Sequence, residues 1–304
     1  MSSPAVERSI RILDYLATHR GQSFTLSELS RRVHISKATT HAILGELTAS
    51  GYLEREQETQ RFRLGPAVIP LAPAAESGMP AIGHARREAR ELAERLGVQA
   101  VVVWASSTEL IYLAHAGMPR AGGFTARPGQ RLPLVPPLGT AFLAWSAPER
   151  VEEWLRRLGP DADAEAMARY RAALEAVRRR GFAVGFRADA YARLSAIYSS
   201  APDEIHTPEA RAELDEAMNG LRHEPYLLDD LENAAKQPLA NISVPIFDSA
   251  ARMVLALSLH LDSRFSGADA PELADQLLRS AASVMDQIDG RRPDVGYLGS
   301  AVGA

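Results

Sequence analysis

The most informative part of the chain is residues 25–64, which read TLSELSRRVHISKATTHAILGELTASGYLEREQETQRFRL. Thr25 stands three residues before Glu28, and this is the reciprocal capping pattern found where a helix begins. We therefore expect a short helix that starts after Thr25 and ends near His34. Ser36 belongs to the residue types that favour the N-cap, so it predicts the start of another helix.

The segments around these two helices complete a small domain. Apolar residues at helical spacing over 6–20 predict a preceding helix, and the helix after the second cap extends over 38–50. Beyond it the apolar period changes from 3.6 to 2, which predicts two strands at 52–55 and 61–64 joined as a hairpin. Three helices followed by a two-stranded wing are the plan of a winged helix-turn-helix domain, here residues 1–72.

In such a domain the third helix enters the major groove of DNA, and side chains near its N-terminus meet base edges and phosphates. Polar residues at those places and the outward arginines of the wing are the predicted DNA contacts: Thr25, Arg31, Ser36, Lys37, Thr39, Thr40, His41, Arg61 and Arg63. The alternative is that Ser36 only caps the helix and that 37–41 is a solvated face. The wing favours DNA, because capping alone does not require two outward arginines.

Composition sets limits on the rest of the chain. The length of 304 residues indicates two domains. The composition, with 46% hydrophobic and 24% charged residues, excludes wholesale disorder. Cysteine is absent, which excludes disulfides, cysteine-ligated metals and a cysteine nucleophile. No signal peptide core opens the chain and no apolar stretch approaches the roughly 20 residues of a membrane span, so we expect a cytoplasmic protein that does not bind membranes.

A second, larger α+β domain is expected after a linker at 73–80. It occupies 81–290, contains a polar, acidic insertion near 200–238, and is followed by a flexible tail at 291–304. Periodicity predicts helices at 82–96, from 139, and at 148–158, 164–180, 208–221 and 270–288, and a loop at 117–137. Apolar runs predict strands at 98–104, 109–116, 182–188, 194–199, 241–247 and 253–261.

Several of these motifs resemble those of one known family. The sequences VERSIRIL (6–13), TLSELSRR (25–32), ISKATTHAIL (35–44), GYLER (51–55) and FRLG (62–65) resemble the DNA-binding half of IclR-family transcriptional regulators. Four later segments resemble the effector-binding half of that family: GQRLPL (129–134), LGTAFLA (138–144), RGFAV (180–184) and ISVPIFD (242–248). The chain departs from the family at position 42, which is alanine where relatives commonly carry arginine, and at 200–238, which is longer than the usual connection.

The resemblance implies a GAF-like second domain, in which a curved antiparallel sheet with flanking helices holds a pocket between sheet and loops. Carried over to this chain, the effector contacts are Leu134, Gly139, Thr140, Asp189, Asn241, Ser243, Ser258 and His260. Polar groups on an apolar sheet face suit a small carboxylate or an aromatic acid, and a His260 charged near neutral pH would attract such an anion. The same residues could equally be satisfied structural groups.

The expected function is that of a transcriptional regulator in which a small-molecule effector changes dimer or tetramer geometry on a double-stranded DNA operator. A homodimer is expected because one recognition helix reads only a few base pairs, and the resemblance implies a tetramer built as a dimer of dimers. No enzymatic activity, cofactor or metal is expected, since catalytic and nucleotide-binding motifs are absent and His84, His115, His206 and His223 lack metal-ligand spacing. Two alternatives stay open: an enzyme fused to a winged-helix repressor domain, and a winged-helix module that binds a protein partner.

Overall fold

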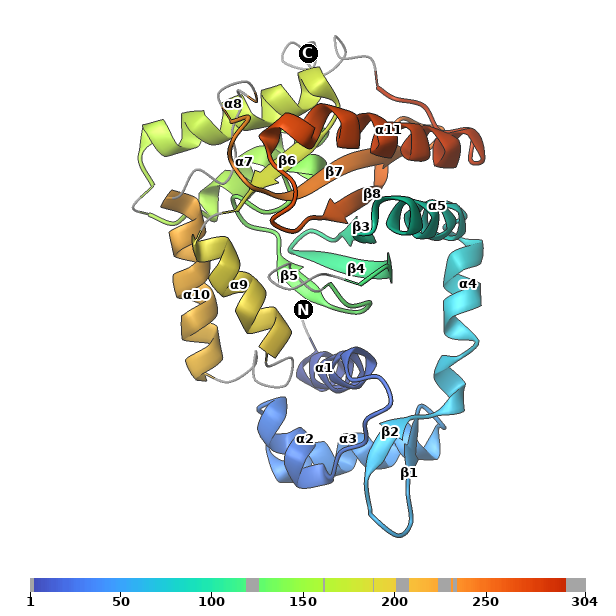
Figure 1. Cartoon of the computed structure of the whole chain (residues 1–304). Coiled ribbons are helices and arrows are strands. Elements are labelled where there is room, and N and C mark those ends of the chain that lie inside the picture. The colour runs from blue at the N-terminus through green and yellow to red at the C-terminus, as the bar shows by residue number, and fades with distance from the viewer. Residues whose placement is uncertain are drawn as a thin grey trace. The chain divides into compact units, whose positions relative to one another are not determined.

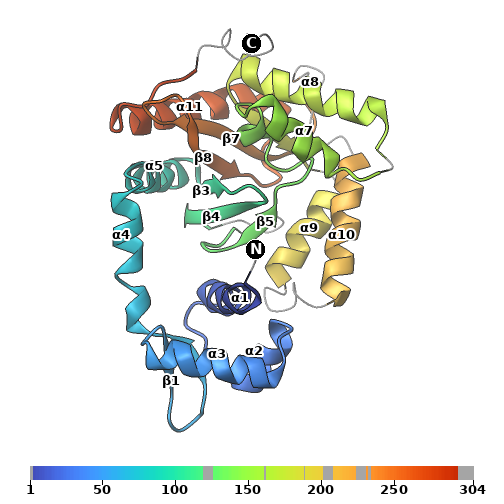
Figure 2. The same ribbon diagram turned by 180° about the vertical axis from the view of Figure 1, so that it is seen from behind.

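The structure, a computed structural model, describes residues 3–118, 126–160, 162–187, 189–200, 208–223, 231 and 234–293. The chain divides into two compact units, one made of residues 1–79 and 197–215 and the other of 80–196 and 216–304. Figures 1 and 2 show the ribbon from opposite sides.

The N-terminal unit has the three helices and the hairpin that the sequence predicts. They are α1 (Pro4–Thr18), α2 (Leu26–Arg32), α3 (Lys37–Ala49), β1 (Leu53–Arg55) and β2 (Phe62–Leu64) (Figure 1). Thr25 and Glu28 cap α2 reciprocally, because the Glu28 amide donates to the Thr25 hydroxyl at 3.3 Å and the Thr25 amide donates to the Glu28 carboxylate at 2.7 Å. The two strands pair antiparallel, with Arg55 opposite Phe62.

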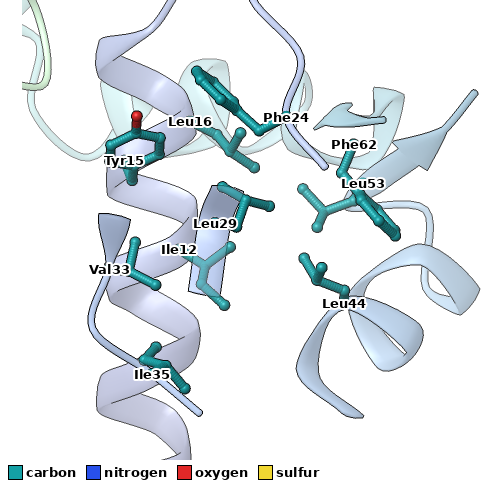
Figure 3. Packing of buried hydrophobic residues seen from close by; sticks show 10 residues of the cluster. All are labelled: Ile12, Tyr15, Leu16, Phe24, Leu29, Val33, Ile35, Leu44, Leu53 and Phe62. Atoms are coloured by element: carbon teal, nitrogen blue, oxygen red, sulfur yellow. The ribbon is translucent and has the colours of Figure 1, made fainter. Parts of the chain in front are cut away.

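One apolar core joins the helices of this unit to its hairpin (Figure 3). Its buried members are Ile12, Tyr15, Leu16, Phe24, Leu29, Val33, Ile35, Leu44, Leu53 and Phe62. Leu44 on α3 and Leu53 on β1 are each only 1% exposed, so the inner face of α3 packs against the first strand of the wing. This packing decides which side chains of α3 remain available to a partner.

The segment after the wing is helical over most of its length. A 3₁₀ turn, η1 (Pro66–Val68), is followed by α4 (Leu71–Ser77), which overlaps the predicted linker at 73–80. The boundary between the two compact units falls after Met79.

The second unit is built on a six-stranded antiparallel sheet with the strand order β5-β4-β3-β8-β7-β6, which curls in the ribbon view (Figure 2). Its strands are β3 (Gln99–Ala105), β4 (Glu109–Ala116), β5 (Arg131–Pro133), β6 (Ala183–Phe186), β7 (Leu239–Phe247) and β8 (Met253–His260). The expected curved antiparallel sheet with flanking helices is confirmed.

Helices pack against this sheet through its apolar residues. The helices α5 (Ala81–Leu96) and α11 (Ala270–Asp286) pack on each other and on strands β3, β7 and β8. The short α6 (Thr140–Leu143) packs on β7 and β8 and on α7 (Pro148–Arg156) and α8 (Ala164–Arg180). Ile242 and Val244 are fully buried and alternate with Ser243, so β7 turns an apolar face to one side and a polar residue to the other.

Two sequence predictions in this unit are wrong. The predicted strand at 194–199 lies in a helix, α9 (Asp189–Ser200), because Ala190, Tyr191 and Leu194 are buried at the i, i+1, i+4 spacing of a helix rather than in alternation. The predicted loop at 117–137 contains β5, which pairs with β4 although it is only three residues long.

The predicted insertion near 200–238 contains one described helix, α10 (Pro208–His223). Residues 201–207, 224–230 and 232–233 of this insertion and 294–304 of the predicted tail lie outside the described residues. In the described ranges, no helix is both long and apolar enough to cross a membrane.

Candidate DNA-binding surface and effector cavity

Helix α3 presents one face to the core and the other to solvent. Thr40 and Leu44 are buried. The exposed residues recur at helical spacing and are Lys37, Ala38, His41, Ala42, Gly45, Glu46 and Ala49. Small residues lie along the middle of this face, so the helix backbone can approach a major groove closely.

Ser36 and Thr39 lie together at the start of α3. The Ser36 hydroxyl accepts a 3.2 Å hydrogen bond from the Thr39 amide, and the two hydroxyls are 2.9 Å apart. Ser36 is therefore the N-cap, as predicted, and it is also exposed. Lys37 and His41 are exposed beside it, so these four residues form one surface.

Thr40 does not belong to this surface. Its side chain is fully buried, and its hydroxyl donates to the carbonyl of Ile35 at 3.4 Å. The prediction of a DNA contact at Thr40 is wrong for this structure, because Thr40 precedes Leu44 by one helical turn and shares its inward face.

Two predicted contacts lie on or beside α2. Thr25 is the N-cap described above, and its hydroxyl also donates to the Glu28 carboxylate at 3.1 Å. Arg31 is exposed in the last turn of α2. A DNA contact at either residue stays a prediction.

The two wing arginines named by the sequence are held by other groups of the protein. Arg61 donates to the Ser23 carbonyl at 2.6 Å and pairs with the Glu28 carboxylate at 3.1 Å. Arg63 pairs with Glu54 at 2.8 Å on the facing strand. The Thr25 amide, together with Arg61, lowers the pKa of Glu28, which keeps this carboxylate ionised.

The second unit contains a cavity of about 80 Å³ between its sheet and the segment leading into α6. Six of the eight predicted effector contacts line it, namely Gly139, Thr140, Asn241, Ser243, Ser258 and His260. The other lining residues are Val103, Leu110, Tyr112, Leu132, Pro137, Leu138, Ala141, Phe142, Ala183, Val184, Tyr191, Leu194 and Ala256. No lysine, arginine, aspartate or glutamate is among these described residues, so hydroxyl, amide and imidazole groups supply the polarity.

Strand register explains why the polar residues meet. Ser243 on β7 stands opposite Ser258 on β8. Two residues from this pair along the strands, Asn241 stands opposite His260. Residues two apart on a strand share a face, so all four side chains belong to one face of the sheet. The Ser258 hydroxyl donates to the Ser243 hydroxyl at 2.7 Å.

The imidazole of His260 is neutral in this cavity. Burial lowers the pKa of His260 to about 4, because the charged form loses its hydration. The ring centroid lies 5.8 Å from that of Tyr112. The expectation that His260 carries charge near neutral pH is therefore wrong for the cavity as it stands.

Leu134 and Gly139 shape the segment before α6. Gly139 has φ +88°, and a Cβ atom there would lie 2.2 Å from Cδ1 of Leu134, so this turn requires glycine. Leu134 is 1% exposed and is not among the lining residues. It supports the turn from behind, in place of the predicted contact with an effector.

Asp189 is the first residue of α9, but its side chain lies outside the described part of the structure. Tyr112 also forms a wall of the cavity and was not among the predicted contacts, although it lies two residues after Leu110 on a predicted strand and so shares its face. Among the described residues, no three histidine, aspartate or glutamate side chains gather as metal ligands would.

Comparison with known proteins identifies relatives along the whole chain. Residues 5–57 match the IclR helix-turn-helix domain. The transcriptional regulator XynR of Escherichia coli is 24% identical over 285 residues, which cover 92% of this chain and 95% of that protein. The regulator BhcR of Paracoccus denitrificans is 28% identical over 155 residues, which cover 51% of this chain and 55% of that protein.

Solved structures share the fold. The IclR transcriptional regulator of Alicyclobacillus acidocaldarius has a TM-score of 0.61 at 23% identity, covering 94% of this chain and 99% of that one. An IclR homologue from Microbacterium hydrocarbonoxydans, solved in complex with 4-hydroxybenzoate, has a TM-score of 0.61 at 19% identity with the same coverage. The matched helix-turn-helix domain, the relatives that span the chain and the shared fold support an IclR-type DNA-binding transcriptional regulator, with an effector-binding domain after its helix-turn-helix domain.

Proposed function

We propose that this regulator binds a double-stranded operator through the exposed face of α3, with Ser36, Lys37, Thr39 and His41 at the DNA. The observation that carries this proposal is the division of α3 into a packed face and an exposed face. An exposed cation beside hydroxyl groups at the start of a recognition helix suits phosphates and base edges. Lys37→Ala is expected to weaken operator binding and to lower the salt dependence of binding by about one unit. An unchanged slope would remove Lys37 from the interface and favour the protein-docking alternative.

The effector we propose is a small carboxylic acid, aromatic acids included, that occupies the cavity of the second unit. Its apolar part would lie against residues such as Leu110 and Phe142, and its polar groups would bond to Ser243, Ser258 and Asn241. Support comes from the shared fold of the homologue that holds 4-hydroxybenzoate. Because the described lining contains no cationic side chain, neutral donors would have to hold the carboxylate.

A thermal-shift comparison tests this effector class. A ligand that binds only the folded state raises the melting temperature by mass action. We expect 4-hydroxybenzoate or a smaller carboxylate to raise it, and the matching neutral amide to raise it less. A larger rise with the amide would show that the cavity selects uncharged ligands, and a flat response to both would remove aromatic acids from the proposal.

The proposed assembly is a homodimer, and a tetramer formed as a dimer of such dimers. A two-fold dimer presents two recognition helices to two half-sites, which gives useful specificity. Exposed apolar side chains on α1 (Val6 and Ile10) and after the wing (Ile69 and Leu71) support a subunit contact there. Analytical ultracentrifugation of Ile10→Glu against the unchanged protein tests it, since a charge in the contact should shift the population toward monomer.

A further inference from the structure

A groove separates the wing from the recognition helix within the N-terminal unit. We refer to it as the wing groove, and it has a volume of about 330 Å³. Its lining residues are Thr25, Leu26, Ser27, His41, Leu44, Gly45, Thr48, Arg55, Gln60 and Phe62. None of these residues is acidic, whereas Arg55 and His41 bring basic groups from the wing and from α3.

The three arginines of the hairpin differ in what holds them. Arg61 is anchored to Ser23 and to Glu28, and Arg63 is paired with Glu54 on the facing strand. Arg55 lies over the ring of Phe62, with its guanidinium carbon 5.5 Å from the ring centroid. In the described part of the chain Arg55 makes no ion pair, so its charge is not neutralised by a carboxylate.

The direction of Arg55 follows from strand register. It stands opposite Phe62, while Glu54 stands opposite Arg63. Neighbouring residues on a strand point to opposite faces, so Arg55 shares the groove face with Phe62, and the Glu54–Arg63 pair occupies the other face. The exposed Arg55 therefore carries positive charge toward the groove, beside the exposed face of α3.

We propose that the wing groove seats a phosphodiester of the operator backbone, with Arg55 as its anchoring cation. A guanidinium offers a planar set of N–H donors that matches two phosphate oxygens, and stacking on Phe62 orders this set before DNA arrives. Arg61 is then a positioning residue, because its bonds to Ser23 and Glu28 tie the wing to the start of α2. This assignment rests on the proposed operator binding through α3.

The salt dependence of DNA binding tests the assignment. The probe is a duplex that the unchanged full-length protein enriches from a random-sequence pool, and the readout is the slope of log K against log salt concentration. Loss of one phosphate contact lowers the magnitude of this slope by about 0.9. We expect that loss for Arg55→Ala, and a preserved slope for Arg55→Lys, which keeps the charge. Arg20→Ala is the control, because it removes the same charge from an exposed arginine of the same unit that is not among the predicted DNA contacts.

Each outcome decides the assignment. The expected pattern is a lower slope for Arg55→Ala alone, with melting temperatures of all three variants close to that of the unchanged protein. An unchanged slope for Arg55→Ala, or an equal loss for Arg20→Ala, overturns the proposal. A lower melting temperature in both Arg55 variants without a change of slope gives Arg55 a structural role and also overturns it. If the unchanged protein enriches no duplex, operator binding itself fails, which is a different result from an altered slope.

Discussion

The Ser258 hydroxyl donates a 2.7 Å hydrogen bond to the Ser243 hydroxyl, across the paired strands β7 and β8 and at the wall of the cavity. Each hydroxyl keeps further bonding capacity, because a serine hydroxyl has one donor and two acceptor positions. The pair can therefore bind a ligand without leaving either serine unsatisfied.

Filling the cavity from Ser243 should block the effector and spare DNA binding. Ser243→Leu adds a bulky apolar group to a volume of about 80 Å³, so the thermal shift with 4-hydroxybenzoate should disappear while operator affinity stays unchanged. Ser263→Leu, at an exposed serine of the same unit, is the control and should keep the shift. If Ser243→Leu loses both folding and DNA binding, the serine is a core residue and this test fails.

Stability should depend on pH through His260. Its pKa is about 4 in the folded protein and about 6.5 when unfolded, so the unfolded state binds the proton first as pH falls. The contribution of the neutral imidazole is fully present above the unfolded pKa and is lost as pH falls toward the folded pKa. Relative to His260→Gln, the free energy of unfolding should fall by roughly 2 kcal/mol between about pH 7 and pH 5. Urea denaturation across this range measures it, and parallel curves for the two proteins would contradict it.

Ser36 allows capping and DNA contact to be separated. Asp is as good an N-cap as Ser and suits the positive end of the helix dipole, so Ser36→Asp should retain the melting temperature. The added negative charge should still weaken operator binding several-fold, because it would face phosphates. Ser36→Ala should instead lose about 1 kcal/mol of stability through the missing cap. Unchanged operator affinity in Ser36→Asp would place this residue away from the DNA.

Thr40 provides the opposite test on the same helix. Thr40→Val keeps the shape of a side chain that is fully buried, and it removes only the 3.4 Å bond to the Ile35 carbonyl. Operator affinity, measured by fluorescence anisotropy at fixed salt, should stay within about twofold of that of the unchanged protein. A buried side chain that does not touch the DNA contributes little to the free energy of DNA binding. A large loss in a variant that folds normally would mean that α3 presents Thr40 to DNA after all.

The sequence determined the local elements that position the candidate surfaces. The capping pair Thr25 and Glu28, the N-cap Ser36 and the change of period after Gly51 depend only on neighbouring residues, and the structure has α2, α3 and the wing where these signals predict them. The family resemblance named Asn241, Ser243, Ser258 and His260, and the two-residue alternation of a strand places the members of each pair, 241 with 243 and 258 with 260, on one face whichever strands pair. Local chemistry was sufficient because each of these signals acts within a few residues.

Only the tertiary structure decided which of these side chains are available and in what state. Thr40 lies inside because one face of α3 packs on α2 and β1, and Arg61 is anchored because Ser23, 38 residues earlier, lies beside it. His260 is neutral because strands distant in sequence bury it. Residues 189–200 form a helix because their buried apolar side chains follow helical spacing, and burial is set by contacts with other segments. Exposure, ion pairing and pKa are properties of contacts between distant segments, so a single sequence could nominate these residues but could not assign their partners.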